Sequence, residues 1–532
     1  MASSPLSSDA SDTKEDISRR TFFSGIVGLL AILMGFFWFR WQRKQVTARF
    51  VGPAVERGHL LRIEYKNNAT GTSEKIDTAI IGGGVSGLSA AWYLNNHGYK
   101  NFALFELEDK VGGNASWGEN RFSRYPWGAH YLPTPGKDAT YVQELLREMG
   151  ILKNGKYSEE CLVHEVEERL FIYGIWQEGL KPLMGARAVD KKDFEAFRNL
   201  TQSYSKRKGS DGRPAFTIPL ALSSRDPQLL ALDRITATEF LASQGFTSQR
   251  LFWYIDYSLR DEYGSNRSNT SAWALIHYFA ARGNMHNLVW PEGNGFLVEY
   301  MRSRVEPYIH TGKALRHIEK GTNDYALHFL DFASGQIRKV SAKNIIFSIP
   351  KFILSYLYPQ LHAEKAAHTR AFTYSPWMTA NFLVNHFDME NPAWDNVIYG
   401  SHSLGYVVAE HQKIGKLPHA RTLTFFHAFD EDDTLQSRRR LLSMSERGAL
   451  DFALRELEIP HPHIHDSIEE VGVYRWAHAM IRPIPGFITG NIARLFDTID
   501  RNFYGAHSDL SGMSNFEEAQ YRGVTAAKRI LS

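Results

Sequence analysis

Residues 75–106 read KIDTAIIGGGVSGLSAAWYLNNHGYKNFALFE, and this stretch decides the fold. Residues 75–81 form a short apolar run that predicts a buried strand, and residues 101–105 predict a second one. Between them, residues 88–96 are rich in Ala and Leu and predict a helix that ends before Gly98. The order of strand, glycine-rich turn, helix and strand is the βαβ arrangement of a parallel sheet.

The glycines between the first strand and the helix have the spacing of a dinucleotide-binding turn. Gly82 permits the tight turn, Gly84 lets the backbone approach a pyrophosphate, and Gly87 lets the helix pack closely on the strand. Val85 and Ser86 lie in this turn, and the N-terminus of the helix that follows directs a positive dipole end toward phosphate. These residues predict a dinucleotide site.

An acidic residue completes this pattern. Glu106 follows the second strand and lies 19 residues beyond Gly87. A carboxylate at this position accepts hydrogen bonds from the ribose of a bound dinucleotide. The two strands, the helix and the acid together make the prediction far more specific than three glycines alone would.

Two later motifs resemble the flavin-containing amine oxidase superfamily, which includes phytoene desaturases and protoporphyrinogen oxidases. They are Gly112-Gly113-Asn114 and Trp127-Gly128-Ala129-His130-Tyr131. Asn114 stands where the family usually has an arginine that contacts phosphate. The resemblance implies FAD as the cofactor, bound in a glutathione-reductase-type fold. It places around FAD the residues Gly82, Gly84, Gly87, Glu106, Gly112, Gly113, Asn114, Gly128, Ala129 and His130.

The resemblance continues toward the C-terminus. Residues 291–297 are similar to a glycine turn before a helix, and they lead to Leu315, where the family's backbone meets the adenine. Phe516 and Glu517 begin a helix whose N-terminus is implied to lie against the flavin. Just before it, Gly505-Ala506-His507 takes the place of a motif that ends in an acid. His507 stands for that acid, or Asp509 does if the loop is longer.

These motifs predict an α/β chain with a glutathione-reductase-type FAD-binding Rossmann domain and an inserted α+β substrate domain. Each domain is expected to be assembled from separated parts of the sequence. The FAD-binding domain takes residues 74–150, 285–351 and 471–532, and the substrate domain takes residues 151–284 and 352–470. In the last of these, residues 437–456 predict one helix.

The N-terminus predicts a targeting segment. Arg19 and Arg20 precede 19 uncharged residues, Thr21 to Phe39, which is about the length of a membrane-spanning helix. Adjacent arginines before such a run match a twin-arginine export signal within residues 1–48, and a plain membrane anchor is the alternative. We therefore expect export to the periplasm, with a retained anchor in the inner membrane, and a polar stretch between this segment and residue 74.

Composition narrows the classes of site and partner. The 61 Lys and Arg residues nearly balance the 58 Asp and Glu residues, so we expect no nucleic-acid partner. Cys161 is the single cysteine, which excludes an internal disulfide and a multi-cysteine metal site. His461, His463 and His465 would share one face of a strand, but no acid or cysteine is spaced to join them, so we expect a surface turn and no metal.

The segment after residue 470 supplies the candidates for the reacting side of the flavin. Trp476, His478 and Met480 alternate along a predicted strand and are expected to face it. The resemblance implies hydride transfer from a substrate C–N or C–C bond to flavin N5, with oxygen or quinone as electron acceptor. A membrane-associated desaturase of a lipophilic substrate and a catalytically silent flavin-binding partner of a membrane assembly are the alternatives. Monoamine oxidases have a pair of tyrosines that enclose the amine, and Asn515 stands where one of them would be. This difference argues against a true amine oxidase.

Overall fold

The glycine-rich stretch forms the centre of a mostly parallel sheet in the computed structural model of the protein. Strand β2 (Glu74–Ile81), helix α3 (Val85–Asn96) and strand β3 (Phe102–Phe105) follow one another as predicted. β2 and β3 pair in parallel, with Ile80 beside Leu104. The parallel part of the sheet is completed by β12 (Ile309–His310), β15 (Gln336–Phe347) and β22 (Phe503–Gly505). This confirms the Rossmann-type α/β fold.

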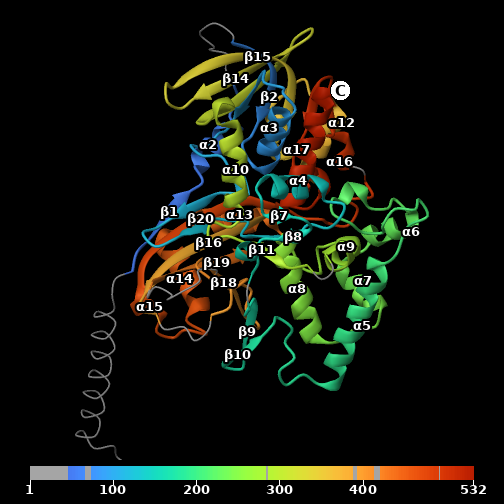
Figure 1. Ribbon diagram of the computed structural model, residues 1–532, viewed down its shortest axis with the longest axis vertical. Coiled ribbons are helices and arrows are strands. Elements are labelled where there is room, and N and C mark those ends of the chain that lie inside the picture. The colour runs from blue at the N-terminus through green and yellow to red at the C-terminus, as the bar shows by residue number, and fades with distance from the viewer. Residues whose placement is uncertain are drawn as a thin grey trace, which may run out of the picture. The chain divides into compact units, whose positions relative to one another are not determined.

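An antiparallel extension and a helical layer surround this parallel core. Strands β13 (Lys313–Lys320) and β14 (Tyr325–Asp331) continue the sheet beyond β15. Helices α3, α10 (Gly295–Val305) and α17 (Phe516–Leu531) pack beside one another (Figure 1). Their apolar residues and those of one sheet face bury a common core that includes Ile80, Leu104 and Ile346.

A second sheet has eight strands and is largely antiparallel. From one edge to the other its strands are β1 (Ala48–Gly52), β20 (Ile468–Ile481), β16 (Tyr374–Asn385), β19 (Ala420–Ala428), β18 (Tyr406–Val408), β17 (Asp395–Ile398), β9 (Glu168–Ile172) and β10 (Ile175–Glu178). A helical region accompanies it, with α5 (Ala188–Ser205), α7 (Ala237–Ser243), α8 (Gln249–Tyr263) and α9 (Ala272–Arg282). Shorter elements connect these parts: α4 (Thr140–Glu148), α6 (Pro227–Leu230), α11 (Leu354–Leu357), α12 (Ala363–His368), α16 (Ile492–Leu495), β4 (Trp117–Glu119), β5 (Arg124–Pro126), β6 (Tyr131–Pro133), β7 (Leu152–Lys153), β8 (Lys156–Tyr157), β11 (Asn287–Val289) and β21 (Thr498–Asp500).

Three details differ from the sequence-based expectations. The domain boundary expected between residues 470 and 471 falls inside β20, which pairs with β16 over most of its length. The single helix expected over residues 437–456 is two helices, α13 (Thr434–Ser443) and α14 (Glu446–Leu457), because the Ser445 side chain accepts from the amide of Gly448 and begins a new helix. The stretch before residue 74, expected to be only polar, contains β1 and α2 (Val55–Leu60).

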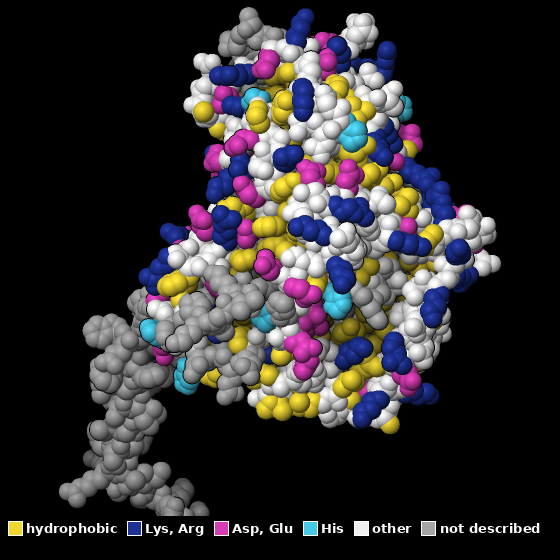
Figure 2. Space-filling model, in the orientation of Figure 1, with side chains coloured by type: hydrophobic (Ala, Val, Ile, Leu, Met, Phe, Trp, Pro, Cys, Tyr) yellow, Lys and Arg dark blue, Asp and Glu magenta, His cyan; other side chains and the backbone are white. Residues whose placement is uncertain are grey.

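The structure describes residues 46–65, 74–163, 165–282, 285–387, 392–411, 420–490 and 492–532. The predicted export segment around Arg19 and Arg20 lies outside these residues. Within them, no helix has the length and apolar character needed to cross a bilayer. Lys and Arg side chains are interspersed with Asp and Glu over the face shown in Figure 2.

Candidate functional site

A cavity of about 390 Å³ opens at the glycine-rich turn and is lined by residues of both sheets. Thirteen of the predicted cofactor and flavin-facing residues line it: Gly82, Gly84, Val85, Ser86, Glu106, Gly113, Asn114, Ala129, Leu315, Trp476, His478, His507 and Phe516. Asp509, the alternative to His507, and Asn515 line it as well. The other predicted residues do not line this cavity, and they are Gly87, Gly112, Gly128, His130, Met480, Gly505 and Glu517. The motifs from three distant parts of the sequence therefore converge on one place.

The turn after β2 has the backbone geometry of a phosphate cradle. Gly82 has φ +103°, and a Cβ there would lie 2.4 Å from Cγ2 of Ile349. A Cβ on Gly87 would lie 1.9 Å from the carbonyl oxygen of Gly82, so Gly87 packs under the turn instead of facing the cavity. Gly84 has only Cα of Gly113 within 4 Å of such an atom, at 3.8 Å. The space beside Gly84 is thus open for a ligand.

The first turn of α3 supplies hydrogen-bond donors to this space. The first backbone hydrogen bond of the helix runs from the amide of Leu88 to the carbonyl of Gly84, at 3.0 Å. The amides of residues 85–87 precede it and have no carbonyl within the helix to bind. Free amides at a helix N-terminus bind phosphate well, so the residues present fit the diphosphate of a dinucleotide.

Glu106 lies at the end of β3, as predicted, and its carboxylate is buried at the cavity. Oε2 accepts from the amide of Gly83 at 2.6 Å, and Oε1 accepts from the amide of Glu108 at 2.8 Å. Burial raises the pKa of Glu106 to about 7, and the two amide donors oppose that shift. Each oxygen keeps a lone pair for a further donor such as a ribose hydroxyl.

Asn114 does not point to phosphate. Its side-chain amide donates to the carbonyl oxygen of Ala479 on β20, so it ties the second glycine motif to the second sheet. The neighbouring Gly112 packs against Ser116, with a Cβ position 3.1 Å from Cα of that residue. The position at which the family has an arginine therefore carries a neutral side chain, and that side chain is hydrogen-bonded to Ala479.

The two candidates for the acid near the C-terminus lie together. His507 and Asp509 both line the cavity, and Nδ1 of His507 lies 3.0 Å from Oδ1 of Asp509. The other oxygen of Asp509 accepts from the amide of Lys351 at 2.8 Å and from the hydroxyl of Tyr374. Asp509 is fully buried and His507 lies beside it, so both predicted candidates for the acid remain at the cavity.

Strand β20 forms one wall, but not by one face as predicted. Trp476 and His478 line the main cavity together with Ala477 and Ala479, while Met480 lines a smaller neighbouring cavity. Consecutive residues of the strand thus line the main cavity, whereas strict alternation would place only every second one there. Burial and nearby cations lower the pKa of His478 to about 3, so this imidazole is neutral at pH 7.

The smaller cavity, of about 110 Å³, shares Asn114, Ala129, Trp476 and Phe516 with the main one. Three carboxylates also line the smaller cavity, and they belong to Asp261, Glu262 and Glu517. The sequence pointed only to Glu517, which it placed at the cofactor. Arg282 pairs with Glu262 at 2.8 Å and with Glu517 at 3.4 Å. The third, Asp261, forms no ion pair with the described residues and accepts from the hydroxyl of Tyr131 at 2.9 Å. His130 lines this cavity too, and burial lowers its pKa to about 4.

More acids lie behind Asp261. Burial raises the pKa of Asp261 to about 6 and that of Glu168 to about 7, and repulsion between the two adds to the shift of Glu168. Asp395 accepts from the hydroxyl of Tyr257 at 3.2 Å, and burial followed by repulsion from Glu168 and Asp261 raises its pKa well above its ordinary value. Buried acids therefore adjoin the small cavity, and their raised pKa values favour their neutral forms.

Residues of α2 and its flanks also line the main cavity, which no sequence signal indicated. They are Pro53, Ala54, Val55, Gly58, His59, Leu61 and Arg62. A six-residue helix has too few turns to show an apolar periodicity, so only the tertiary structure places this segment at the site.

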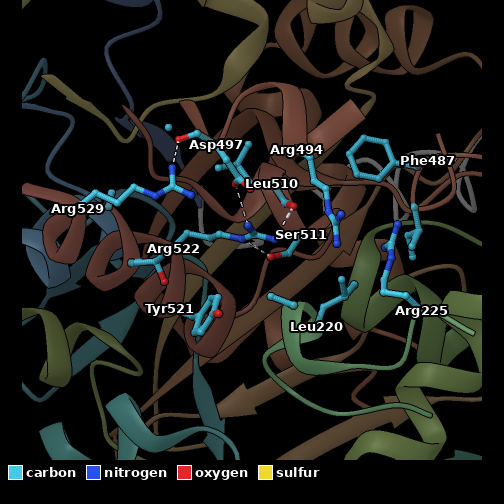
Figure 3. Close-up of a pocket in the computed structure, with 15 residues that line it drawn as sticks. Leu220, Arg225, Phe487, Arg494, Asp497, Leu510, Ser511, Tyr521, Arg522 and Arg529 are labelled. Atoms are coloured by element: carbon cyan, nitrogen blue, oxygen red, sulfur yellow. Dashed lines mark hydrogen bonds and ion pairs between the residues drawn. The ribbon is translucent and has the colours of Figure 1, made fainter. Parts of the chain in front are cut away.

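A third cavity, of about 400 Å³, is lined by four arginines (Figure 3). Arg522 and Arg529 are bound to neighbouring parts of the protein. Arg522 pairs with Asp497 at 3.1 Å and donates to the carbonyl of Leu510, and Arg529 donates to the carbonyl of Asp497. Gly505 is the one predicted cofactor residue that lines it. This cavity lacks the glycine turn and Glu106, so it is not the dinucleotide site.

The three clustered histidines do not share a strand face. His461 and His463 precede the short helix α15 (Ile464–Ser467), which contains His465. Nε2 of His461 lies 2.7 Å from the hydroxyl of Tyr406. Throughout the described part of the chain, no group of three His, Cys, Asp or Glu residues is arranged to hold a metal ion.

Comparisons with known proteins agree with this geometry. The profile of the family "Flavin containing amine oxidoreductase" matches residues 85–531. Amine oxidase [flavin-containing] A of Sus scrofa is 32% identical over 111 residues, which cover 20% of this chain and 20% of the pig protein. Oxidoreductase PigB of Serratia sp. (strain ATCC 39006) is 21% identical over 86% of this chain and 75% of its own.

Solved structures show the same fold. Putrescine oxidase bound to putrescine has a TM-score of 0.63 at 15% identity, covering 86% of this chain and 100% of its own. Cyclohexylamine oxidase from Brevibacterium oxydans IH-35A has a TM-score of 0.63 at 14% identity, covering 86% and 98%. With a family match across most of the sequence and a glycine turn, Glu106 and C-terminal helix at one cavity, the chain belongs to the flavin-containing amine oxidoreductase family, whose cofactor is FAD.

Proposed function

We propose that the protein oxidises the C–N bond of a small amine that enters the 110 Å³ cavity as a cation. The observation that carries this proposal is the position of Asp261 beside the cofactor cavity. The acid has no cationic side chain as partner among the described residues that line the small cavity, since Arg282 is held by Glu262 and Glu517. Glu168 and Asp395 lie behind it with pKa values raised further than that of Asp261, so Asp261 is the first of the three acids to ionise as the pH rises. An ammonium group is the ligand that this arrangement favours.

FAD would be held by the amides of the α3 turn, by Glu106 and by Asp509, with its ring toward the small cavity. Bound FAD supplies a two-electron acceptor for a hydride from the carbon next to the amine nitrogen, which yields an imine. Only the neutral amine has the lone pair that makes this carbon a hydride donor. Asp261, whose pKa of about 6 lies far above that of an ordinary Asp, is placed to take the proton that the ammonium loses.

The aromatic wall positions the substrate and excludes water. Trp476 is fixed because its indole N–H donates to the carbonyl of Trp127 at 2.8 Å. Trp377 lines the small cavity on the neighbouring strand β16, where it pairs with Trp476. The faces of such rings attract cations, with a strength of about 0.5–2 kcal/mol.

The desaturase alternative fits this cavity less well. An apolar substrate would cover Asp261 without giving it a hydrogen-bond donor, and burying an unpaired carboxylate is costly. A fatty acid isomerase from P. acnes has the same fold, with a TM-score of 0.63 at 16% identity, so the architecture itself does not decide between the two substrates. The charge in the cavity supports the amine.

We also propose that residues 18–39 direct export by the twin-arginine route and hold the protein at the periplasmic side of the inner membrane, with oxygen or quinone as electron acceptor. The support is the arginine pair and the 19 uncharged residues after it.

The test of the amine proposal is anaerobic flavin reduction. The holoprotein is mixed with a panel of primary and secondary amines and with lipophilic alkanes and alkenes of similar size, and loss of flavin absorption is followed. We expect bleaching by an amine and a large decrease in Asp261→Asn. Bleaching by the lipophilic compounds alone would establish the desaturase instead. No bleaching by any compound would favour the silent flavoprotein.

A further inference from the structure

We propose that residues 53–62, here called the cover segment, close the FAD cavity and that Arg62 supplies positive charge to the cofactor's diphosphate. This proposal rests on FAD binding and does not depend on the substrate. The cover segment lies outside the family match, which begins at residue 85. Its role is therefore inferred from this chain's own contacts.

The cover segment is attached to both sheets. Before it, β1 adds a parallel edge strand to β20 of the second sheet, with Ala48 beside Val471. After it, the guanidinium of Arg316 on β13 donates to the carbonyl of Ile63 at 3.1 Å, and the hydroxyl of Tyr65 lies 2.9 Å from Nδ1 of His328 on β14. The chain thus crosses from the second sheet to the first, and Figure 1 shows α2 between β1 and the strands β14 and β15.

The middle of the cover segment is held at the ribose end of the cavity. The amide of Ala54 donates to Oε1 of Glu108 at 3.2 Å, two residues beyond Glu106. On the outer side, Arg57 pairs with Asp109 at 2.8 Å. Seven residues of the segment line the same cavity as Gly84 and Ser86. A dinucleotide in this cavity would lie under the segment.

Arg62 is the arginine of the segment that lines the cavity. Its guanidinium makes no hydrogen bond or ion pair with any described residue and lies 5.2 Å over the ring of Phe352. The other lysine or arginine that lines the described cavity, Lys313, pairs with Asp331 at 2.8 Å. Phe352 stacks on His478 at 4.3 Å, and Arg438 lies 2.6 Å from Nε2 of that histidine. Arg62 therefore lies near the cation and aromatic rings around His478, while the acids Glu106, Glu108 and Asp509 line other parts of the same cavity.

Such a half-buried arginine calls for an anion. The diphosphate carries the negative charge of FAD, and an arginine binds phosphate through paired N–H donors. Asn114, at the position where the family has an arginine, is neutral and bonded to Ala479. Arg62 brings the missing charge from a different part of the chain, and the segment that carries it must move before FAD can leave.

The experiment measures FAD release from the holoprotein after dilution, followed by the rise of free-flavin fluorescence. Arg62→Gln is compared with Arg62→Lys, which keeps the charge, and with Arg49→Gln. Arg49 lies on β1, pairs with Glu470, and has a side chain that is 67% exposed and away from the cavity. We expect release to be about 10-fold faster in Arg62→Gln, with a smaller effect in Arg62→Lys and the wild-type rate in Arg49→Gln.

Amide hydrogen exchange tests the closure without any mutation. Residues 53–62 should exchange more slowly in the holoprotein than in the apoprotein, while residues 188–205 of α5, which do not line the cavity, should not change. Wild-type release in Arg62→Gln, equal acceleration in Arg49→Gln, or unchanged exchange in the cover segment would each overturn the proposal. None of these measurements uses an amine. Failure of the cover-segment proposal would therefore leave the proposed amine oxidation untested, and failure of amine oxidation would not affect these results.

Discussion

The hydroxyl of Tyr131 donates to Oδ2 of Asp261 across 2.9 Å, and this bond joins the glycine-motif region to helix α8 of the helical region. It fixes one oxygen of the acid and leaves the other available at the small cavity. The residues come from positions 130 apart in the sequence, so the substrate cavity exists only because the two regions pack together.

The first prediction concerns amine affinity. Asp261→Asn keeps the shape of the side chain but removes its charge, and a charge-assisted hydrogen bond contributes about 1.5–3 kcal/mol. We expect the affinity for a non-oxidisable amine, measured from its perturbation of the flavin spectrum, to fall roughly 10- to 150-fold. Asp256→Asn is the matched control, because Asp256 pairs with Arg267 and does not line the cavity. Equal losses in both variants would contradict the role of Asp261.

The second prediction is a pH dependence of the same binding. Below pH about 6, Asp261 is protonated and neutral, whereas an alkylammonium stays charged, so affinity should fall as the pH is lowered through about 6. Above that pH the ionised acid holds the cation. Glu168, with a pKa raised to about 7, should add a shallower step. In Asp261→Asn the step near pH 6 should disappear, and its persistence would assign it to another group.

The third prediction tests the ribose acid. Glu106→Ala removes the buried acceptor at the cavity, and we expect FAD affinity to fall roughly 10- to 150-fold. Asp109→Ala removes only an ion pair with Arg57, and the Asp109 side chain is 77% exposed, so its effect should be much smaller. Both apoproteins are titrated with FAD and followed by fluorescence quenching. Similar losses in the two variants would mean that Glu106 is not the ribose ligand.

The fourth prediction separates cofactor binding from folding. The Cβ of Gly84→Val has open space in the structure, so the apoprotein should unfold near the wild-type temperature but fail to bind FAD. Gly87→Val places a Cβ 1.9 Å from the carbonyl oxygen of Gly82, which should destabilise the apoprotein itself. Thermal unfolding by circular dichroism and FAD titration distinguish the two. FAD binding by Gly84→Val at wild-type affinity would contradict the cradle.

The fifth prediction concerns export. The double substitution of Arg19 and Arg20 by Lys keeps the charge but removes the arginine pair that the receptor recognises, so the protein should remain in the cytoplasm. Cell fractionation with an antibody against the folded domain measures this. Normal export of the double variant would show that the apolar run is a plain anchor.

The sequence by itself determined the cofactor side of the protein. Strand, turn, helix and strand are local patterns, and residues 75–106 contain all of them, so the positions of Gly82, Gly84 and Glu106 followed from spacing alone. The boundaries of β2 and β3 lie within one residue of those patterns because apolar periodicity and glycine conformation act over a few residues, whereas α3 begins at Val85, three residues before the predicted start.

The substrate side was decided by tertiary structure. Asp261, Glu168 and Asp395 come from three distant segments and meet because β9 pairs with β17 and α8 packs beside them, and no local spacing records such a meeting. Asn114 is bonded to Ala479 across 365 positions of sequence, and the cover segment reaches the cavity only because β1 pairs with β20. Local propensity fixes elements over several residues, whereas long-range strand pairing and burial fix which side chains face one another.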